Sequence, residues 1–387
     1  MLLQSSVQSI CSMKEDWKYS KLGEICDLYQ PKTISGDMLL EDGEYLVYGA
    51  NGIIGRYDKY NHVESEVLLT CRGATCGSIN ISEPYSWING NAMVVHPSNE
   101  KELRKDFIRY YLASVDWSKV ITGAAQPQIT RQSLSPLQVA CPPLPEQESI
   151  VSELDCLSSI IEKQKQQLKE LDNLAQSIFY TTFGDPTSNN FGWKNRRLGE
   201  MVNSNMIGLT RSGSEQDASY KYLYFKMNNI GNEGGVDWSK TTRVNACAQE
   251  VEKYTLKEGD FLFNTRNSFE LVGKTCVYPH IDGEICLFNN NIMRIDFKKE
   301  INATYMAYLF QDKYTKNQLD RIKKGTTSVW AIYYKDLEKI DILVPDIALQ
   351  EEFASKVAAI EKQKEIIKQS IEEVETLFNS RMDYYFN

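Results

Sequence analysis

The chain contains one series of short motifs twice, in the same order. The matched stretches are WKYSKLGE (17–24) with WKNRRLGE (193–200), NGNAMVV (89–95) with NNNIMRI (289–295), ITGAAQPQITRQSLSPLQVACPPLPEQES (121–149) with IKKGTTSVWAIYYKDLEKIDILVPDIALQEE (322–352), and IEKQK (161–165) with IEKQK (360–364). Four landmarks in register indicate an internal duplication. Each copy is predicted to be a globular region followed by one long helix.

Around each IEKQK, apolar residues recur at heptad spacing, which is typical of a helix with a single apolar seam. In the first helix the seam comprises Ile150, Leu154, Leu157, Ile161, Gln164, Leu168, Leu171, Ala175 and Ile178; in the second it comprises Phe353, Val357, Ile360, Lys364, Ile367, Ile371, Val374 and Phe378. Such a helix is not stable alone in water. We therefore expect the two to form an antiparallel coiled coil; the alternative is that each stripe packs on its own globular region.

Each seam is interrupted by a polar residue, Gln164 in the first helix and Lys364 in the second. A polar seam residue costs stability but fixes the register of the pair. The stretch from Gln147 to Lys165 has 19 residues, whereas the stretch from Gln350 to Lys364 has 15. The first helix is thus longer by about one turn, or roughly 6 Å.

The globular regions mix short apolar runs with Gly and Asn turns, a pattern that predicts strands. Apolar spacing at 103–114 and 303–314 predicts helices. The expected fold class is α+β, with two tandem regions of mixed sheet and helices and a pseudo-two-fold internal repeat. The expected boundaries are a tail at 1–16 (with Met13 as an alternative start), globular regions at 17–146 and 187–346, and long helices at 147–186 and 347–387.

Composition narrows the class of protein. No run of 18 apolar residues occurs and the N-terminus lacks a basic region, so neither a membrane span nor a signal peptide is expected. Nine cysteines and the absence of an export signal favour reduced thiols in the cytoplasm. The three histidines are scattered and no CxxC pair occurs, so no metal site is expected.

Motifs for catalysis are absent from the sequence. We find no GxxxxGK[ST] phosphate loop, no GxGxxG dinucleotide loop, no [DN]PP[YFW] methyltransferase tetrapeptide, no HExxH and no GxSxG. We therefore expect a protein without catalytic residues and without a cofactor.

The net charge of −9 is spread unevenly along the chain. The two long helices are acidic, whereas residues 187–346 hold 22 basic and 20 acidic side chains, with basic runs at Lys194–Arg197 and around Arg321–Lys324. Two similar regions separated by helices suit an extended ligand such as duplex DNA. Because contact with DNA phosphates needs Lys and Arg, the weak overall basicity suggests that a partner subunit makes part of the phosphate contacts.

From residue 13 to the end, the chain resembles the specificity subunit of type I restriction–modification systems. The resemblance rests on the duplicated WKxxxLGE starts, the PPLPEQ ending, the IEKQK helices and FGDP at 183–186. The second copy departs from the pattern, with VPDIALQEE in place of PPLPEQES and no FGDP after its helix.

This resemblance implies that each globular region is a target-recognition domain for one half of a split DNA sequence. It implies that the coiled coil spaces the two halves and docks methyltransferase subunits, two in number. Methylation, S-adenosylmethionine binding and ATP-driven translocation would belong to those subunits and to the restriction subunits. Because the base-reading residues of this family vary, the resemblance does not identify them in this chain, and side-chain chemistry must indicate them.

Arginine reads guanine best, while Asn and Gln suit adenine. Residues of these types fall at matching places in the two copies but differ in chemistry, as expected if one scaffold reads two half-sites. The candidate DNA-binding residues are Arg72, Gln126, Gln128, Thr130 and Arg131 in the first region, and Asn264, Arg266, Asn267, Lys323, Lys324, Thr326, Thr327 and Trp330 in the second. The alternative is that Arg72 and Arg266 pair with buried carboxylates or cap a turn.

The sequence is also compatible with two other functions. It could be the recognition module of a related single-chain restriction system, or a coiled-coil assembly scaffold without DNA specificity. Sequence-selective retention on duplex DNA in the presence of a methyltransferase partner separates the scaffold from the other two.

Overall fold

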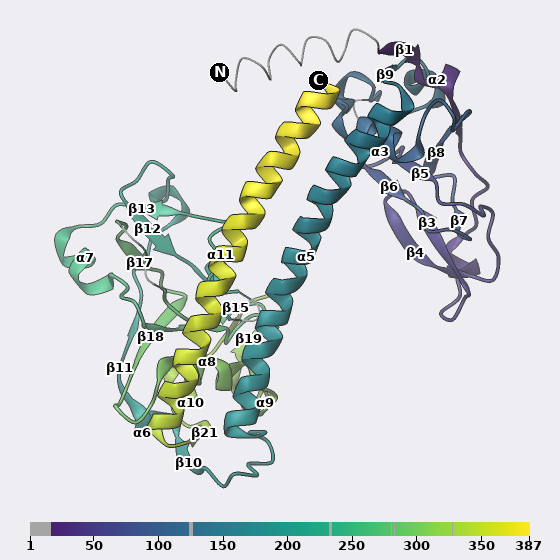
Figure 1. Cartoon of the computed structure of the whole chain (residues 1–387). Helices are drawn as coiled ribbons and strands as arrows, with labels where there is room; N and C mark the ends of the chain where they lie inside the picture. The colour runs from purple at the N-terminus through teal and green to yellow at the C-terminus, as the bar shows by residue number, and fades with distance from the viewer. Residues whose placement is uncertain (1–16, 124–126, 232–233, 280, 282, 327) are drawn as a thin grey trace. The chain divides into compact units, whose positions relative to one another are not determined.

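The computed structural model describes residues 17–387 except 124–126, 232–233, 280, 282 and 327. The chain divides into two compact units, Met1–Lys165 with Gln369–Asn387, and Gln166–Lys368. Each unit contains one globular region and one end of each of two long helices, α5 (Leu144–Phe183) and α11 (Ile347–Phe386) (Figure 1). Both helices have 40 residues, so the expectation that the first is longer is wrong; the four-residue difference places IEKQK later in α5 than in α11.

In the first unit a four-stranded antiparallel sheet forms the main layer. Its order is β2 (Cys26–Tyr29), β8 (Ala92–Pro97), β5 (Val67–Thr70) and β6 (Ile79–Ile81). A smaller sheet has the order β4 (Gly52–Tyr57), β3 (Tyr45–Gly49) and β7 (Trp87–Ile88), in which β3 and β7 are parallel. The remaining elements are β1 (Lys18–Lys21) paired with β9 (Gln138–Cys141), the helices α2 (Leu22–Ile25), α3 (Lys105–Ser114) and α4 (Arg131–Leu134), and the 3₁₀ turns η1 (Gly36–Met38) and η2 (Trp117–Lys119).

The second unit repeats this arrangement strand for strand. Its main sheet has the order β11 (Val202–Ile207), β18 (Ile292–Phe297), β14 (Phe261–Asn264) and β16 (Thr275–Val277), and its smaller sheet has the order β13 (Arg243–Val244), β12 (Tyr222–Phe225) and β17 (Cys286–Phe288). The corresponding outer pair is β10 (Lys194–Arg197) with β21 (Asp341–Val344), and α6 (Leu198–Met201), α8 (Ala303–Gln311) and α10 (Tyr334–Leu337) correspond to α2, α3 and α4. The predicted internal duplication is therefore confirmed.

The second unit also has elements without a named counterpart in the first. They are α7 (Ala248–Tyr254), α9 (Lys313–Ile322), the 3₁₀ turn η4 (Met227–Asn229), and a small sheet of β15 (Arg266–Asn267), β20 (Trp330–Ala331) and β19 (Lys324–Gly325). The 3₁₀ turn η3 (Gly213–Glu215), between β11 and β12, corresponds to η1 between β2 and β3.

The duplication includes the turn that precedes β8 in the first unit and the turn that precedes β18 in the second. The N–H of Asn89 donates to the carbonyl of Tyr48, and the N–H of Asn289 donates to the carbonyl of Phe225, both at 2.9 Å. Both asparagine side chains are buried. These asparagines therefore build the same turn in both units.

The apolar face of each sheet packs on a helix and on the ends of both long helices. In the first unit, Phe107 of α3 and Leu154 of α5 share a core with Phe378 of α11. In the second unit, Tyr305 of α8 shares a core with Phe179 of α5 and Phe353 of α11. The seam thus packs both on the partner helix and on the globular region of its own unit, so the two expected arrangements coexist.

Contacts between α5 and α11 are antiparallel in each unit. In the first, Gln164 Nε2 donates to Ser370 Oγ at 2.6 Å, and Arg381 ion-pairs with Glu153 at 2.8 Å. The contact with the lower residue number in α5, Glu153, has the higher residue number in α11, Arg381. This confirms the predicted antiparallel pairing.

The second unit shows the same antiparallel direction. Lys364 Nζ lies 2.6 Å from Asp172 Oδ1, and the rings of Phe179 and Phe353 are 5.7 Å apart. Lys364, which interrupts the second seam, thus reaches a carboxylate on the facing helix.

Every predicted seam residue is withdrawn from solvent at least in part. The buried members are Ile150, Leu154, Leu157, Ala175, Phe353, Val357, Ile360 and Ile371, and the half-buried ones are Ile161, Gln164, Leu168, Leu171, Ile178, Lys364, Ile367, Val374 and Phe378. The heptad pattern missed Phe179 and Phe183, which are buried more deeply than Ile178. In the described part of the chain, no helix is both long and apolar enough to cross a membrane.

Candidate nucleic-acid interface

In the first unit the two predicted loops meet at the end of β5. Gln128 forms a β-bridge with Arg72 on one side and with Thr122 on the other. The N–H of Ile129 donates to the carbonyl of Cys71 at 2.9 Å. The side chains of Arg72 and Gln128 are both exposed. The structure therefore places an arginine and a glutamine of the candidate set side by side.

The second unit repeats this junction at the end of β14. Ala331 pairs with Arg266 on one side and with Lys324 on the other. The N–H of Ile332 donates to the carbonyl of Thr265 at 2.9 Å, as Ile129 does to Cys71. The loops chosen for their matching places in sequence are therefore equivalent in structure.

The arginines of these loops differ from the rest in having no intramolecular partner. Of the 13 arginines in the chain, eight form ion pairs and Arg56 donates to backbone carbonyls. Over the described residues, the remaining four guanidinium groups have neither an ion pair nor a hydrogen bond; they are Arg72, Arg131, Arg266 and Arg321. All four are exposed. Pairing with buried carboxylates, the structural alternative for Arg72 and Arg266, is therefore not observed.

Two of the candidate residues prove to be structural. Asn264 has no exposed surface, and its side-chain amide donates to the carbonyls of Arg266 and Asn291, both at 3.1 Å. Lys323, whose side chain is only 6% exposed, ion-pairs with Asp320 and donates to the carbonyl of Phe269. Their burial and these contacts argue against direct contact of either side chain with DNA.

Three other candidates form hydrogen bonds or an ion pair with nearby residues of the same unit. The Thr130 hydroxyl accepts from the N–H of Ser133 and so caps α4. Asn267 donates to Asn264, and Lys324 ion-pairs with Asp336. That ion pair includes a hydrogen bond, which lowers the pKa of the Asp336 carboxyl.

Of the four remaining candidates, two lie within the described residues. Thr326 is exposed, and half-buried Trp330 packs edge to face on Phe269, with ring centroids 5.0 Å apart. Gln126 and Thr327 lie outside the described residues.

The two segments that meet at Arg72 lack acidic residues. Residues 67–81 and 117–145 contain no Asp or Glu, although residues 1–146 hold 17 acidic side chains. Burial raises the pKa of Cys71 to about 11, so the thiol beside Arg72 stays neutral. The positive charge of Arg72 is therefore not compensated within these two segments.

Helix α9 adds basic groups that the sequence reasoning missed. Residues 313–335 carry six basic side chains and one acidic one, Asp320, which Lys323 already neutralises. Lys313 and Lys316 are exposed on α9, which leads directly into β19. Counting charge over this whole stretch would have identified them.

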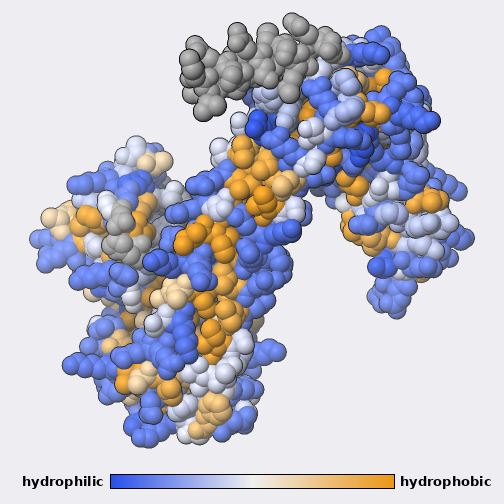
Figure 2. Space-filling model, in the orientation of Figure 1, coloured by the Kyte–Doolittle hydropathy of each residue, from blue (hydrophilic) through white to orange (hydrophobic). Residues whose placement is uncertain are grey.

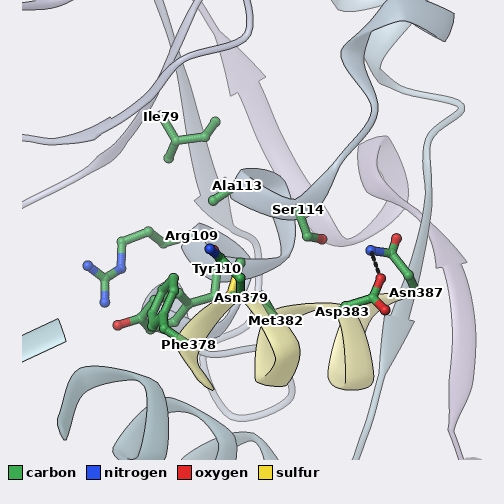
Figure 3. Close-up of a pocket in the computed structure, with 10 residues that line it drawn as sticks. All are labelled: Ile79, Arg109, Tyr110, Ala113, Ser114, Phe378, Asn379, Met382, Asp383 and Asn387. Carbon is green, nitrogen blue, oxygen red and sulfur yellow. Dashed lines mark hydrogen bonds between the residues drawn. The ribbon is translucent and has the colours of Figure 1, made fainter. Parts of the chain in front are cut away.

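A hollow of about 510 Å³ lies in the first unit between α3 and the end of α11 (Figure 3). Arg109 at its wall ion-pairs with Asp155, and Phe378 and Met382 supply apolar lining. In the part of the chain that the structure describes, no group of three or more His, Cys, Asp or Glu side chains could hold a metal ion.

Comparison with known proteins decides the family. The sequence model of the type I restriction modification DNA specificity domain matches residues 14–173 and again residues 190–376. The chain belongs to the type I restriction–modification specificity family. The two matches correspond to the two copies of the internal repeat.

Relatives of the specificity family include two named subunits. The EcoKI specificity subunit of Escherichia coli K12 is 21% identical over 289 residues, which cover 70% of this chain and 62% of that protein. The MjaVIII specificity subunit of Methanocaldococcus jannaschii is 22% identical over 390 residues, which cover 93% of this chain and 90% of that protein.

Solved structures share the fold of the specificity family along the whole chain. The S subunit of a type I system from M. genitalium has a TM-score of 0.63 at 16% identity and covers 96% of each chain. A chain from a study of complex assembly and conformational transition of the type I R-M system has a TM-score of 0.53 at 18% identity, covering 97% of this chain and 98% of that one.

Proposed function

We propose that the chain is the non-catalytic DNA-recognition subunit of a type I restriction–modification complex. Each globular region, as a target-recognition domain, reads one half of a bipartite duplex target. The observation that carries this proposal is the location of the four arginines without partners. In the first unit Arg72 lies just after β5 and Arg131 at the start of α4, and in the second Arg266 lies in β15 and Arg321 near the end of α9.

An exposed arginine without a carboxylate can donate two parallel hydrogen bonds to guanine O6 and N7. A paired arginine would first have to give up its partner. The segments that carry Arg72 and Arg266 are held by the same backbone hydrogen bonds, but the side chains differ: Gln128 pairs with Arg72 where Ala331 pairs with Arg266, and Lys324 takes the place of Thr122 on the far side. Equivalent scaffolds with different side chains suit the reading of two different half-sites.

Phosphate contact is assigned to the basic residues beside these loops. Lys313 and Lys316 of α9 are exposed and have no carboxylate partner in the described part of the chain. Because the chain as a whole is acidic, methyltransferase subunits are expected to supply further basic surface. They and the restriction subunits would carry the chemistry, in the cytoplasm.

The long helices are proposed to dock the methyltransferase subunits and to set the spacer between half-sites. Ile366 and Leu377 of α11 are 59% and 46% exposed, and Figure 2 shows apolar side chains gathered over this helix. Apolar side chains of this size favour burial against a partner. The hollow lined by Phe378 and Met382 adds apolar surface at the end of α11.

Selection from a duplex library tests the proposal. The chain is purified with the methyltransferase subunits of its host and used to select from a pool of randomised duplexes, and the retained molecules are sequenced. The expected result is a bipartite consensus with a fixed spacer. Retention without any sequence preference would support the scaffold reading instead.

A further inference from the structure

The turn that joins β3 to β4 lies against the strand that leads to Arg72. Gly49 pairs with Gly52 across this turn, so Ala50 and Asn51 form its tip. The hydroxyl of Thr70, the last residue of β5, donates to the carbonyl of Ala50. Only Cys71 separates Thr70 from Arg72 along the chain. The tip is therefore fixed to the edge of the candidate interface.

A second contact orients the Asn51 side chain. Asn80 Nδ2 on β6 donates to Asn51 Oδ1 at 3.1 Å. Asn51 is exposed, and its Nδ2 forms no hydrogen bond within the described residues. An amide with one oxygen lone pair and both N–H groups free can still donate and accept at once.

The turn itself does not require asparagine at position 51. Its left-handed backbone position is Gly52, with φ of 101°. Among the described residues other than glycine, only Tyr85 and Asn189 have positive φ, so Asn51 is not in that region. The usual reason for asparagine in a tight turn therefore does not apply to Asn51.

Two isoleucines beside the tip are exposed together. The register shifts within β4, so that Val47 pairs with Gly55 while Tyr48 pairs with Ile53. Ile54 is the extra residue of this bulge, and as a result Ile53 and Ile54 are 58% and 48% exposed. Apolar side chains at such a tip can contact the methyl group of thymine.

The tip segment itself also lacks acidic residues, although the exposed Glu83 lies nearby, where its N–H donates to the Tyr48 hydroxyl at 3.0 Å. Residues 46–57 contain no Asp or Glu, as is true of residues 67–81 and 117–145. Together the three segments carry four basic residues, Arg56, Arg72, Lys119 and Arg131. A carboxylate near the tip would repel phosphate, and none is present in these segments.

We infer that the β3–β4 tip is a second base-reading element of the first recognition region. Asn51 presents its amide to N6 and N7 of an adenine, and Ile53 contacts the methyl group of a neighbouring thymine. This inference rests on the proposed function. It assigns to the first half-site one A·T-dependent position that is distinct from the position read by Arg72.

Over its described residues, the second unit does not join the corresponding strands by a short hairpin. The strands that correspond to β3 and β4 are β12 and β13, and residues 226–242 separate them. An effect of Asn51 should therefore be confined to one half-site.

The test is the duplex selection described above, repeated with Asn51→Ala in the complex with methyltransferase. The expected result is loss of preference at one A·T position of one half-site, by about 5-fold to 150-fold, the range of a bidentate contact. Asn51→Gln keeps an amide on a longer stem, and is expected to change the preference at the same position. Asn99→Ala, an exposed asparagine outside the three segments, is the control and should leave the consensus unchanged.

Two outcomes overturn the inference. One is an unchanged consensus for both Asn51 variants; the other is an equal loss of retention on every sequence at an unchanged melting temperature. If Arg72→Ala and Arg266→Ala change the consensus while the Asn51 variants do not, only this inference fails. If no variant changes it and the unaltered chain has no consensus, the proposed function fails as well.

Discussion

Gln147 and Gln350 make the same three hydrogen bonds at the starts of α5 and α11. Gln147 Oε1 accepts from the N–H of Arg104 at 2.9 Å, and Gln350 Oε1 accepts from the N–H of Asn302 at the same distance. Each amide nitrogen also donates to two carbonyls, one just before α3 or its counterpart α8 and one just before its own helix. Both side chains are completely buried.

Replacement of either glutamine by alanine should destabilise the chain. The substitution leaves an N–H and two carbonyls unpaired in a buried place, and each such group costs about 1–3 kcal/mol. We expect Gln147→Ala and Gln350→Ala each to lower the free energy of unfolding by at least about 2 kcal/mol, measured by urea denaturation. Gln167→Ala, at an exposed position of α5, is the control and should change it by less than about 0.5 kcal/mol.

The ion pair of Lys364 should stabilise the helix pair over a defined pH range. Burial lowers the pKa of Lys364, but hydrogen bonds to Asp172 and Glu361 raise it more, so the pKa lies above its usual value. A raised pKa means that the folded state holds the proton more tightly than the unfolded state does. The stabilisation is therefore complete below the unfolded pKa of Lys and is lost as pH rises through the folded one.

We expect Lys364→Met to lower the free energy of unfolding by roughly 1–3 kcal/mol at neutral pH. The difference from the unaltered chain should stay constant up to about pH 10 and shrink above it. Urea titrations at several pH values measure it, with Lys362→Met as the control, since Lys362 in the same IEKQK motif is exposed. An equal effect of both substitutions would show that the seam position of Lys364 has no special role.

Lys316 on α9 should contact phosphate rather than a base. Lys316→Ala is expected to weaken binding of the methyltransferase complex equally on all duplexes, and to reduce the slope of log K against log salt by about one. Fluorescence anisotropy at several salt concentrations measures this slope. Lys240→Ala, an exposed lysine elsewhere in the second unit, should leave it unchanged. A changed consensus with Lys316→Ala would instead mark this lysine as a base reader.

If the helices set the spacer, a change of helix length should change the spacer alone. Removal of four residues from 152–160 of α5 takes out about one turn, or roughly 6 Å. Methylation-site sequencing is expected to show a different spacer preference with both half-sites unchanged. A change in half-site preference would contradict the spacer role.

The fold could be predicted largely because the chain carries its pattern twice. Apolar runs indicated strands in both globular regions, and heptad spacing indicated the antiparallel helices; because each pattern occurs twice, it is distinguished from chance. The seam pattern failed at Phe179 and Phe183 because the core of the second unit, rather than the partner helix alone, buries these rings. The sequence spacing of apolar residues does not distinguish these two kinds of burial.

The candidate interface could be predicted only as loops, not as individual side chains. Matching places in the repeat identified the neighbourhoods of Arg72 and Arg266. They did not show that Asn264 holds backbone carbonyls or that Lys323 is covered by Phe269, because these contacts join segments distant in sequence. The sequence did not indicate a binding role for Asn51, because an Asn-Gly pair is typical of a hairpin turn.

The central claim is that each region reads its own half-site, and methylation-site sequencing with Arg72→Ala and Arg266→Ala tests it most directly. The Arg72→Ala complex should lose about 1–3 kcal/mol of discrimination in one half-site, and the Arg266→Ala complex should lose as much in the other. Lys101→Ala, an exposed residue in the first unit, serves as the control. Loss in the same half-site for both arginines, or uniform loss on all sequences, would contradict the account.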